Sequence, residues 1–182
     1  MPRLTLVRHG EAAAGWGDSD DPGLSELGRR QAESVAEALA TASTPRPILV
    51  SPKRRCRETA APLERRWSIE ATVDAAVGEV RHPDVADRGA WLHDLMAGTW
   101  SDAEPDARGW ADGVVERLLA IEADTVVVSH FVAINVAIGR ATGDDRVLVV
   151  RLGNASRTVL DSDGSSLTLV QPPTEVADTT VL

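Results

Sequence analysis

The sequence predicts an α/β fold, a three-layer α/β/α sandwich around a mostly parallel, mixed central sheet. Short apolar runs alternate along the chain with segments whose apolar residues recur at helical spacing, which is the pattern of βαβ units. Some of these runs are apolar at consecutive positions, as expected for buried strands covered by helices. A late cluster of strand-like runs indicates that part of the sheet departs from parallel pairing.

The elements follow in order along the chain. Strands are predicted at residues 4–8, 48–50, 69–73, 125–128, 147–150, 156–160 and 167–170. Helices are predicted within the segment 24–39 with Ser25 as the N-cap, over 53–67 with a kink or restart at Pro62, and over 91–96, 114–122 and 131–140. Residues 12–23 and 102–109 are predicted to be loops, and residues 74–90 a mixture of loop and helix.

Length and composition suit one domain. The 182 residues are 43% hydrophobic and 26% charged, so the chain can bury a core and global disorder is not expected. We predict a single domain over residues 1–182, with residues 171–182 as a loose C-terminal tail.

The formal net charge of −9 argues against nucleic acid or an anionic membrane as the main partner, because both favour a basic surface. Cys56 is the single cysteine, and the N-terminal residues do not resemble a signal peptide. We therefore expect a cytoplasmic protein without a membrane span. The composition leaves the oligomeric state open.

Three predicted strands end in polar groups that suit chemistry. The first ends in Arg8 and His9, the second leads into the basic segment 51–60, and the one at 125–128 ends in Ser129-His130. The carboxyl ends of parallel strands share one edge of a sheet, so these groups should converge there. Arginine matches the oxygens of a phosphate, and the helix after His130 would add free N–H groups.

Four motifs in order carry a family resemblance. Residues 6–11 read Leu-Val-Arg-His-Gly-Glu, residues 24–32 carry a Leu, Gly and Gln-Ala pattern, residues 51–60 contain Ser-Pro-x-x-Arg, and residues 127–130 end in a second histidine. A weaker likeness follows at residues 154–156. Over residues 3–160 the sequence resembles the histidine phosphatase superfamily, whose branch 1 also contains the cofactor-dependent phosphoglycerate mutases. The resemblance implies a phosphoglycerate mutase-like fold.

The resemblance implies a role for each matched residue. His9 corresponds to the nucleophile that takes the phosphoryl group, and Arg8, Arg55 and His130 correspond to the groups that hold its oxygens. Glu79 lies where the family places its proton donor, with Glu11, Asp18 and Asp84 as rival carboxylates. We expect no metal and no cofactor.

Substrate contacts are less well marked. Glu11, His82 and Phe131 are the candidates. Arg81 and His82 fit a substrate contact and an ordinary polar loop equally well. Phe131 departs from the family, which commonly has glycine after the second histidine, and so changes that corner of the pocket.

Other reactive or aromatic residues have simpler explanations. Cys56 stands where the family usually has alanine, so we expect a buried filler rather than a thiolate nucleophile. Arg54 and Arg57 are expected on a solvated helix face, and His93 in a structural or exposed position. Three tryptophans between residues 91 and 110 suit helix-to-sheet packing better than a pocket wall.

The predicted function is a phosphatase that hydrolyses phosphomonoesters, or phosphohistidine in a protein, through a phosphohistidine on His9. Its partner would be a small phosphorylated molecule or a phosphoprotein. A phosphoglycerate mutase is the first alternative, but residues 79–90 lack the glycine-rich pattern of that branch, and the chain leaves little room for its insertions. A non-catalytic phosphate-binding module is the second alternative.

Overall fold

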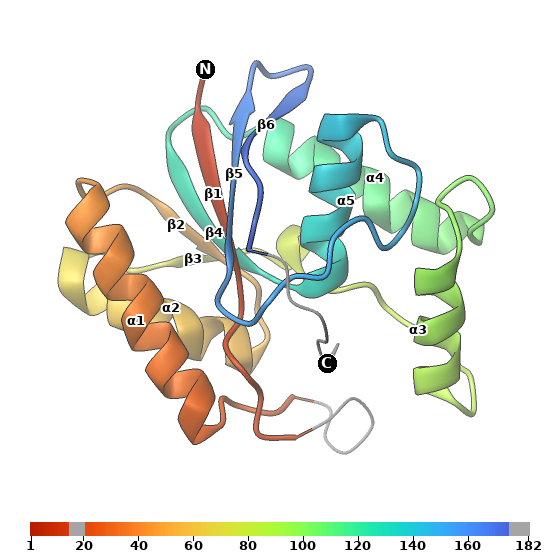
Figure 1. Cartoon of the computed structure of the whole chain (residues 1–182), viewed down its shortest axis with the longest axis horizontal. Coiled ribbons are helices and arrows are strands. Elements are labelled where there is room, and N and C mark those ends of the chain that lie inside the picture. The colour runs from red at the N-terminus through yellow and green to blue at the C-terminus, as the bar shows by residue number, and fades with distance from the viewer. Residues whose placement is uncertain (15–20, 175–182) are drawn as a thin grey trace.

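In the computed structural model, residues 1–14 and 21–174 are described, and they form one six-stranded sheet with strand order β3-β2-β4-β1-β5-β6 (Figure 1). The strands are β1 (Arg3–Arg8), β2 (Ile48–Val50), β3 (Thr72–Val73), β4 (Thr125–Ser129), β5 (Arg157–Ser162) and β6 (Leu167–Gln171). The helices are α1 (Glu26–Ala42), α2 (Arg54–Trp67), the 3-10 turn η1 (Ala75–Val77), α3 (Arg88–Ala97), α4 (Pro105–Leu119) and α5 (Phe131–Thr142).

Strand pairing confirms a mixed sheet. The strands β3, β2, β4 and β1 run parallel to their neighbours, whereas β5 pairs antiparallel with both β1 and β6. Parallel pairing places the ends of β1, β4 and β2 at one edge, since Arg8 lies opposite Ser129 and Val50 lies opposite Val128. This carboxyl edge faces the bottom of Figure 1.

Helices cover both faces of the sheet (Figure 1). Alternate strand residues divide between two buried clusters. Val7, Val126 and Val128 pack with residues of α1 and α2, whereas Leu4, Leu6 and Val127 pack with residues of α4 and α5. Burial on both faces explains why these strands are apolar at consecutive positions. The predicted three-layer sandwich is therefore present.

The structures of α1 and α2 confirm one sequence prediction and correct another. The hydroxyl of Ser25 accepts the N–H of Gly28 at 2.9 Å, which is the predicted N-cap of α1. The predicted restart at Pro62 is wrong, because α2 continues through this residue without a break. Pro62 removes one backbone donor, and burial of Ala60, Leu63 and Trp67 on the same helix offsets that loss.

Two other predictions also need correction. Residues 102–109 are not all loop, since α4 begins at Pro105 with Asp106 in its first turn. Proline is well suited to the first position of a helix, where it loses no hydrogen bond. The predicted strand at residues 147–150 is not formed. Instead, the side-chain oxygen of buried Asn135 accepts the N–H groups of Val149 and Val150 at 2.9 and 2.8 Å, which satisfies them without a sheet partner.

Some predictions fall outside the part of the chain that is described. Asp18, the middle of the predicted loop 12–23 and most of the predicted tail belong to residues 15–20 and 175–182. Across residues 1–14 and 21–174, no helix combines the length and hydropathy that crossing a bilayer requires.

Candidate active site at the carboxyl edge of the sheet

Two histidines and an arginine meet where β1, β4 and α2 come together. The guanidinium of Arg55 donates from Nε to His9 Nε2 at 3.2 Å and from Nη2 to His130 Nδ1 at 3.1 Å. The two imidazole rings lie edge to face with their centroids 5.3 Å apart. All three side chains are buried. The structure therefore brings together the groups that the sequence placed at separate strand ends.

The partners of His9 indicate its tautomer. Its Nδ1 lies 2.7 Å from the carbonyl oxygen of Gly10, to which it donates, so Nε2 keeps its lone pair and accepts from Arg55. Burial and the positive charge of Arg55 lower the pKa of His9 to about 3. His9 is therefore neutral at physiological pH, with the lone pair of Nε2 directed at a guanidinium group.

His130 is held in the opposite tautomer. Its Nδ1 accepts from Arg55, and its Nε2 donates to the hydroxyl oxygen of Ser51 at 2.7 Å. Burial, with His9 and Arg55 nearby, lowers the pKa of His130 well below its ordinary value. A role for Ser51 was missed in the sequence, although it follows a buried strand directly, as His9 and His130 do. That position was the signal that could have found it.

Arg8 is the largest fully buried side chain in the described part of the protein. It donates from Nη1 to the carbonyl oxygen of Leu152, and its Cζ lies 5.0 Å from the centre of the Phe131 ring. Burial lowers the pKa of Arg8 to about 10, with Glu79 acting in the opposite direction and Arg55 adding to the decrease. Arg8 is still cationic at neutral pH, so two guanidinium groups contribute to this region.

Glu79 reaches the same region from the segment after η1. Its two carboxyl oxygens accept N–H groups from Val80 at 3.0 Å and from Val132, in the first turn of α5, at 3.1 Å. The hydroxyl of Ser129 donates to the carbonyl oxygen of Val77 and so ties η1 to the end of β4. Burial raises the pKa of Glu79 even though these N–H groups and both arginines oppose the increase. A carboxyl group with a raised pKa can carry a proton that it donates in a reaction.

The helix pair α1 and α2 fixes the backbone of the motif residues. The N–H of Gly10 donates to Thr59 Oγ1 at 3.0 Å, and Thr59 in turn donates to the carbonyl oxygen of Arg55. A side chain at Gly10 would come within 2.6 Å of the carbonyl oxygen of Gly28, so glycine is required at this close approach.

Each predicted substrate contact has a protein partner in the structure. Glu11 instead accepts the hydroxyl of Ser25 at 2.6 Å, beside the N-terminus of α1. His82 is half-buried, and its Nδ1 lies 2.8 Å from the carbonyl oxygen of Pro83. Phe131 is buried against Arg8 rather than at an open surface. A substrate contact for Glu11 or His82 stays a prediction.

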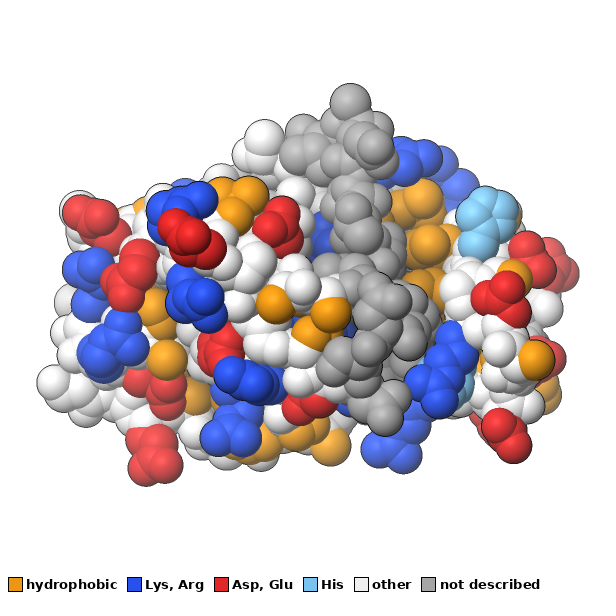
Figure 2. Space-filling model, turned by 90° about the horizontal axis from the view of Figure 1, so that it is seen from below, with side chains coloured by type: hydrophobic (Ala, Val, Ile, Leu, Met, Phe, Trp, Pro, Cys, Tyr) orange, Lys and Arg blue, Asp and Glu red, His pale blue; other side chains and the backbone are white. Residues whose placement is uncertain are grey.

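The cysteine and the two other arginines in the first turn of α2 lie in surroundings that do not suit catalysis. Cys56 is fully buried, with its sulfur 3.4 Å from His130 Nε2, and burial raises the pKa of its thiol to about 12. A thiol in this state is a poor nucleophile. Arg54 pairs with Glu58 at 2.6 Å on the exposed side of α2, and Arg57 is exposed. Charges of both signs alternate across this side of the molecule (Figure 2).

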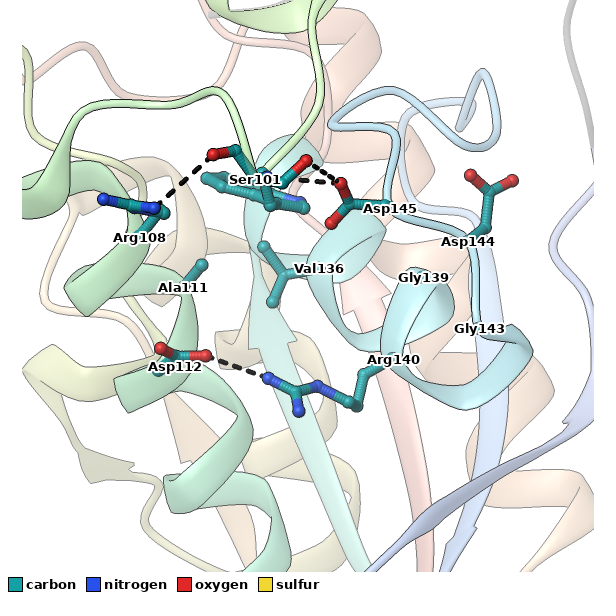
Figure 3. A pocket seen from close by; sticks show the side chains of 11 residues that line it. Ser101, Arg108, Ala111, Asp112, Val136, Gly139, Arg140, Gly143, Asp144 and Asp145 are labelled. Atoms are coloured by element: carbon teal, nitrogen blue, oxygen red, sulfur yellow. Dashed lines mark hydrogen bonds and ion pairs between the residues drawn. The ribbon is translucent and has the colours of Figure 1, made fainter.

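A separate cavity of about 400 Å³ lies between α4 and α5 (Figure 3). We call it the α4–α5 cleft, and its lining includes Ser101, Asp112, Val136, Arg140 and Asp145. Arg140 is paired with Asp112 at 2.9 Å, and Asp145 accepts the hydroxyl of Ser101 at 2.6 Å. Its lining contains none of the predicted site residues.

Comparison with known proteins identifies the family and the fold. The family model of the histidine phosphatase superfamily (branch 1) matches residues 4–172. The chain belongs to this superfamily. Arg8, His9, Arg55 and His130 all lie within the matched residues. Among curated proteins, none matches the sequence significantly.

Solved structures share the fold at low identity. A mycobacterial hydrolase is 24% identical with a TM-score of 0.75, and the alignment covers 97% of this chain and 100% of the other. A mycobacterial glucosyl-3-phosphoglycerate phosphatase in complex with VO3 is 23% identical with a TM-score of 0.73, over 94% and 99% of the two chains. A phosphoserine phosphatase from Entamoeba histolytica is 19% identical with a TM-score of 0.74, over 97% and 98%.

Proposed function

We propose that this member of the superfamily is a phosphatase that hydrolyses phosphate monoesters through a covalent phosphohistidine on His9. The observation that carries the proposal is the hydrogen bond between His9 Nε2 and the guanidinium of Arg55 in a buried, cationic site. It places a neutral nucleophile beside a group that binds phosphate oxygens. The solved phosphatases of the same fold are consistent with this class of reaction.

In the first step, the Arg55 Nε–H leaves His9 Nε2 for a phosphate oxygen, and the freed lone pair of His9 Nε2 attacks the phosphorus atom of the ester. The N–P bond forms as the bond from phosphorus to the ester oxygen breaks, and charge shifts over the phosphate oxygens. Arg8, Arg55 and the Nε2–H of His130 are the proposed donors to those oxygens, with Ser51 released as the partner of His130. Glu79 gives its proton to the departing alcohol oxygen and becomes a carboxylate.

In the second step, water hydrolyses the phosphohistidine. The Glu79 carboxylate takes a proton from the attacking water, the new bond from phosphorus to oxygen forms, and the N–P bond breaks. Inorganic phosphate leaves, His9 is neutral again, and Glu79 is again protonated. The reaction therefore returns both groups to their starting states without another reactant.

The two arginines also indicate the class of substrate. A small phosphate monoester is the first expectation, and a phosphoprotein carrying phosphohistidine is the second. Both present a terminal phosphoryl group that Arg8 and Arg55 can bind, and the second has a leaving nitrogen in place of oxygen. We place the reaction in the cytoplasm.

The test is phosphate release from an aryl phosphate and from a panel of sugar phosphates, nucleotides, phosphoglycerates and phosphohistidine peptides. We expect turnover by the wild type and a loss of at least about a thousandfold in His9→Ala. His93→Ala is the matched control, because His93 is exposed on α3. Equal turnover by wild type and His9→Ala contradicts the proposal. Isomer exchange of phosphoglycerates without free phosphate indicates a mutase instead, and binding of vanadate without any turnover indicates a binding module.

A further inference from the structure

The ring of Phe131 packs against the guanidinium of Arg8 inside the protein. The Cζ atom of Arg8 lies 5.0 Å from the ring centre, and both side chains are at most 2% exposed. Residues that resemble the family motif surround this position, yet glycine is the usual residue there. The departure therefore places an aromatic face where a glycine would leave the guanidinium without one.

This contact has a physical consequence for Arg8. Moving a guanidinium out of water is unfavourable, and the face of an aromatic ring offsets part of that cost more effectively when the pair is desolvated. The carbonyl oxygen of Leu152 accepts from Nη1. The hydrogen bond to Leu152 and the contact with the Phe131 ring both help to hold the guanidinium group of Arg8 in place.

The same helical turn also holds Glu79. Phe131 is the first residue of α5, and the N–H of the next residue, Val132, donates to Glu79 Oε2 at 3.1 Å. The first turn of α5 therefore contacts the Arg8 guanidinium through the Phe131 side chain and the Glu79 carboxyl group through the backbone N–H of Val132. A change of the Phe131 side chain alters the first contact and leaves the backbone donor in place.

We propose that Phe131 is a positioning residue that acts through Arg8, holding its guanidinium in the orientation that binds the phosphoryl oxygens. The inference rests on the proposed function, since it assumes that Arg8 binds phosphate. It replaces the prediction that Phe131 touches the substrate. Phe131→Leu keeps an apolar side chain but removes the aromatic face.

The experiment measures direct binding of orthovanadate by calorimetry, so it does not depend on turnover. The proteins are the wild type, Phe131→Leu, Arg8→Lys and the double variant. Phe131→Leu should weaken binding about tenfold. In the Arg8→Lys background, where the planar group is absent, the same substitution should change affinity less than about twofold.

Matched controls separate positioning from a general loss of packing. Ile138→Val shortens another buried side chain of α5 and should leave vanadate affinity unchanged, with thermal unfolding followed for every variant. If Phe131→Leu does not fold, Phe131→Met takes its place. Equal losses in both Arg8 backgrounds, or no loss in either, overturn the inference. A wild type that does not bind vanadate instead overturns the phosphate site of the proposed function.

Discussion

The carboxyl edge of the sheet and the α4–α5 cleft both contain arginines, but these arginines differ in burial and in their hydrogen-bond partners. At the edge, Arg55 is buried and donates to two neutral imidazoles. In the cleft, Arg140 is half exposed and already paired with Asp112. A carboxylate neutralises the second guanidinium, whereas the first donates to two imidazole nitrogens that carry no charge. Binding of a phosphate relies on well-placed guanidinium donors, and the size of a cavity does not supply them.

Removing one arginine from each region is the strongest test of this comparison. Arg55→Ala should lower kcat/KM for an aryl phosphate by about a thousandfold, because the charge that develops on the phosphoryl oxygens loses a buried donor. Arg140→Ala should change kcat/KM less than about twofold. A comparable loss in both variants would show that the cleft takes part in catalysis.

The carboxyl groups of the two regions should also differ in their effect on the pH profile. Glu79 must be protonated to act as an acid, and its pKa is raised, so kcat should fall as the pH rises through that pKa. His9 must be neutral, and its pKa of about 3 keeps it so across the acidic range. Activity should therefore be highest on the acidic side.

Glu79→Gln isolates this effect. We expect kcat to fall about a hundredfold and the decline toward high pH to disappear, with a smaller loss for an aryl phosphate than for an alkyl phosphate, whose leaving group needs the proton more. Asp112→Asn in the cleft should keep the wild-type profile. An alkaline limb that persists in Glu79→Gln would assign the donor to another group.

Buried histidines should make stability depend on pH. His9 has a pKa of about 3 in the folded protein and an ordinary value near 6.5 when unfolded. Between these values the unfolded chain binds a proton that the native protein does not. The contribution is therefore full above about pH 6.5 and is lost as the pH falls, by up to about 1.4 kcal/mol per pH unit.

Urea unfolding between pH 6 and pH 4 measures this slope. His9→Ala should have a shallower slope than the wild type, whereas His93→Ala, which removes an exposed histidine, should keep the wild-type slope. Identical slopes for all three proteins would indicate that burial of His9 has no such effect.

The smallest effect is expected in the cleft. The ion pair between Asp112 and Arg140 is more than half exposed on both sides, so its contribution is screened by solvent. Asp112→Ala should lower the free energy of unfolding by less than about 1 kcal/mol in a urea titration. A decrease of several kcal/mol would mean that this pair supports the packing of α4 on α5.

Much of the fold and the core of the site could be predicted from local patterns. Apolar runs at consecutive positions identified β1, β2 and β4, and the polar residues at or directly after the strand ends identified Arg8, His9 and His130. The rule that parallel strands share a carboxyl edge then brought these groups together.

Long-range contacts explain the features that were not predicted. Residues 147–150 have the composition of a strand, but the N–H groups of Val149 and Val150 donate to the side chain of Asn135 on the preceding helix α5, and Val147 donates to the carbonyl oxygen of Gly98. Phe131 looks like a pocket residue in the sequence, and only packing shows that its ring contacts Arg8. Glu79 was selected by family likeness, since nothing in its neighbourhood of the chain shows that Val132 will hold its carboxyl group.

The central claim is that His9 carries the phosphoryl group during turnover. Wild-type protein mixed with an aryl phosphate, quenched in alkali within milliseconds and digested for mass spectrometry, tests it most directly. We predict one phosphoryl group on the peptide that contains His9, formed before steady-state release of phosphate and absent from His9→Ala. A phosphoryl group on His130 or Cys56, or turnover by His9→Ala at the wild-type rate, would contradict the account.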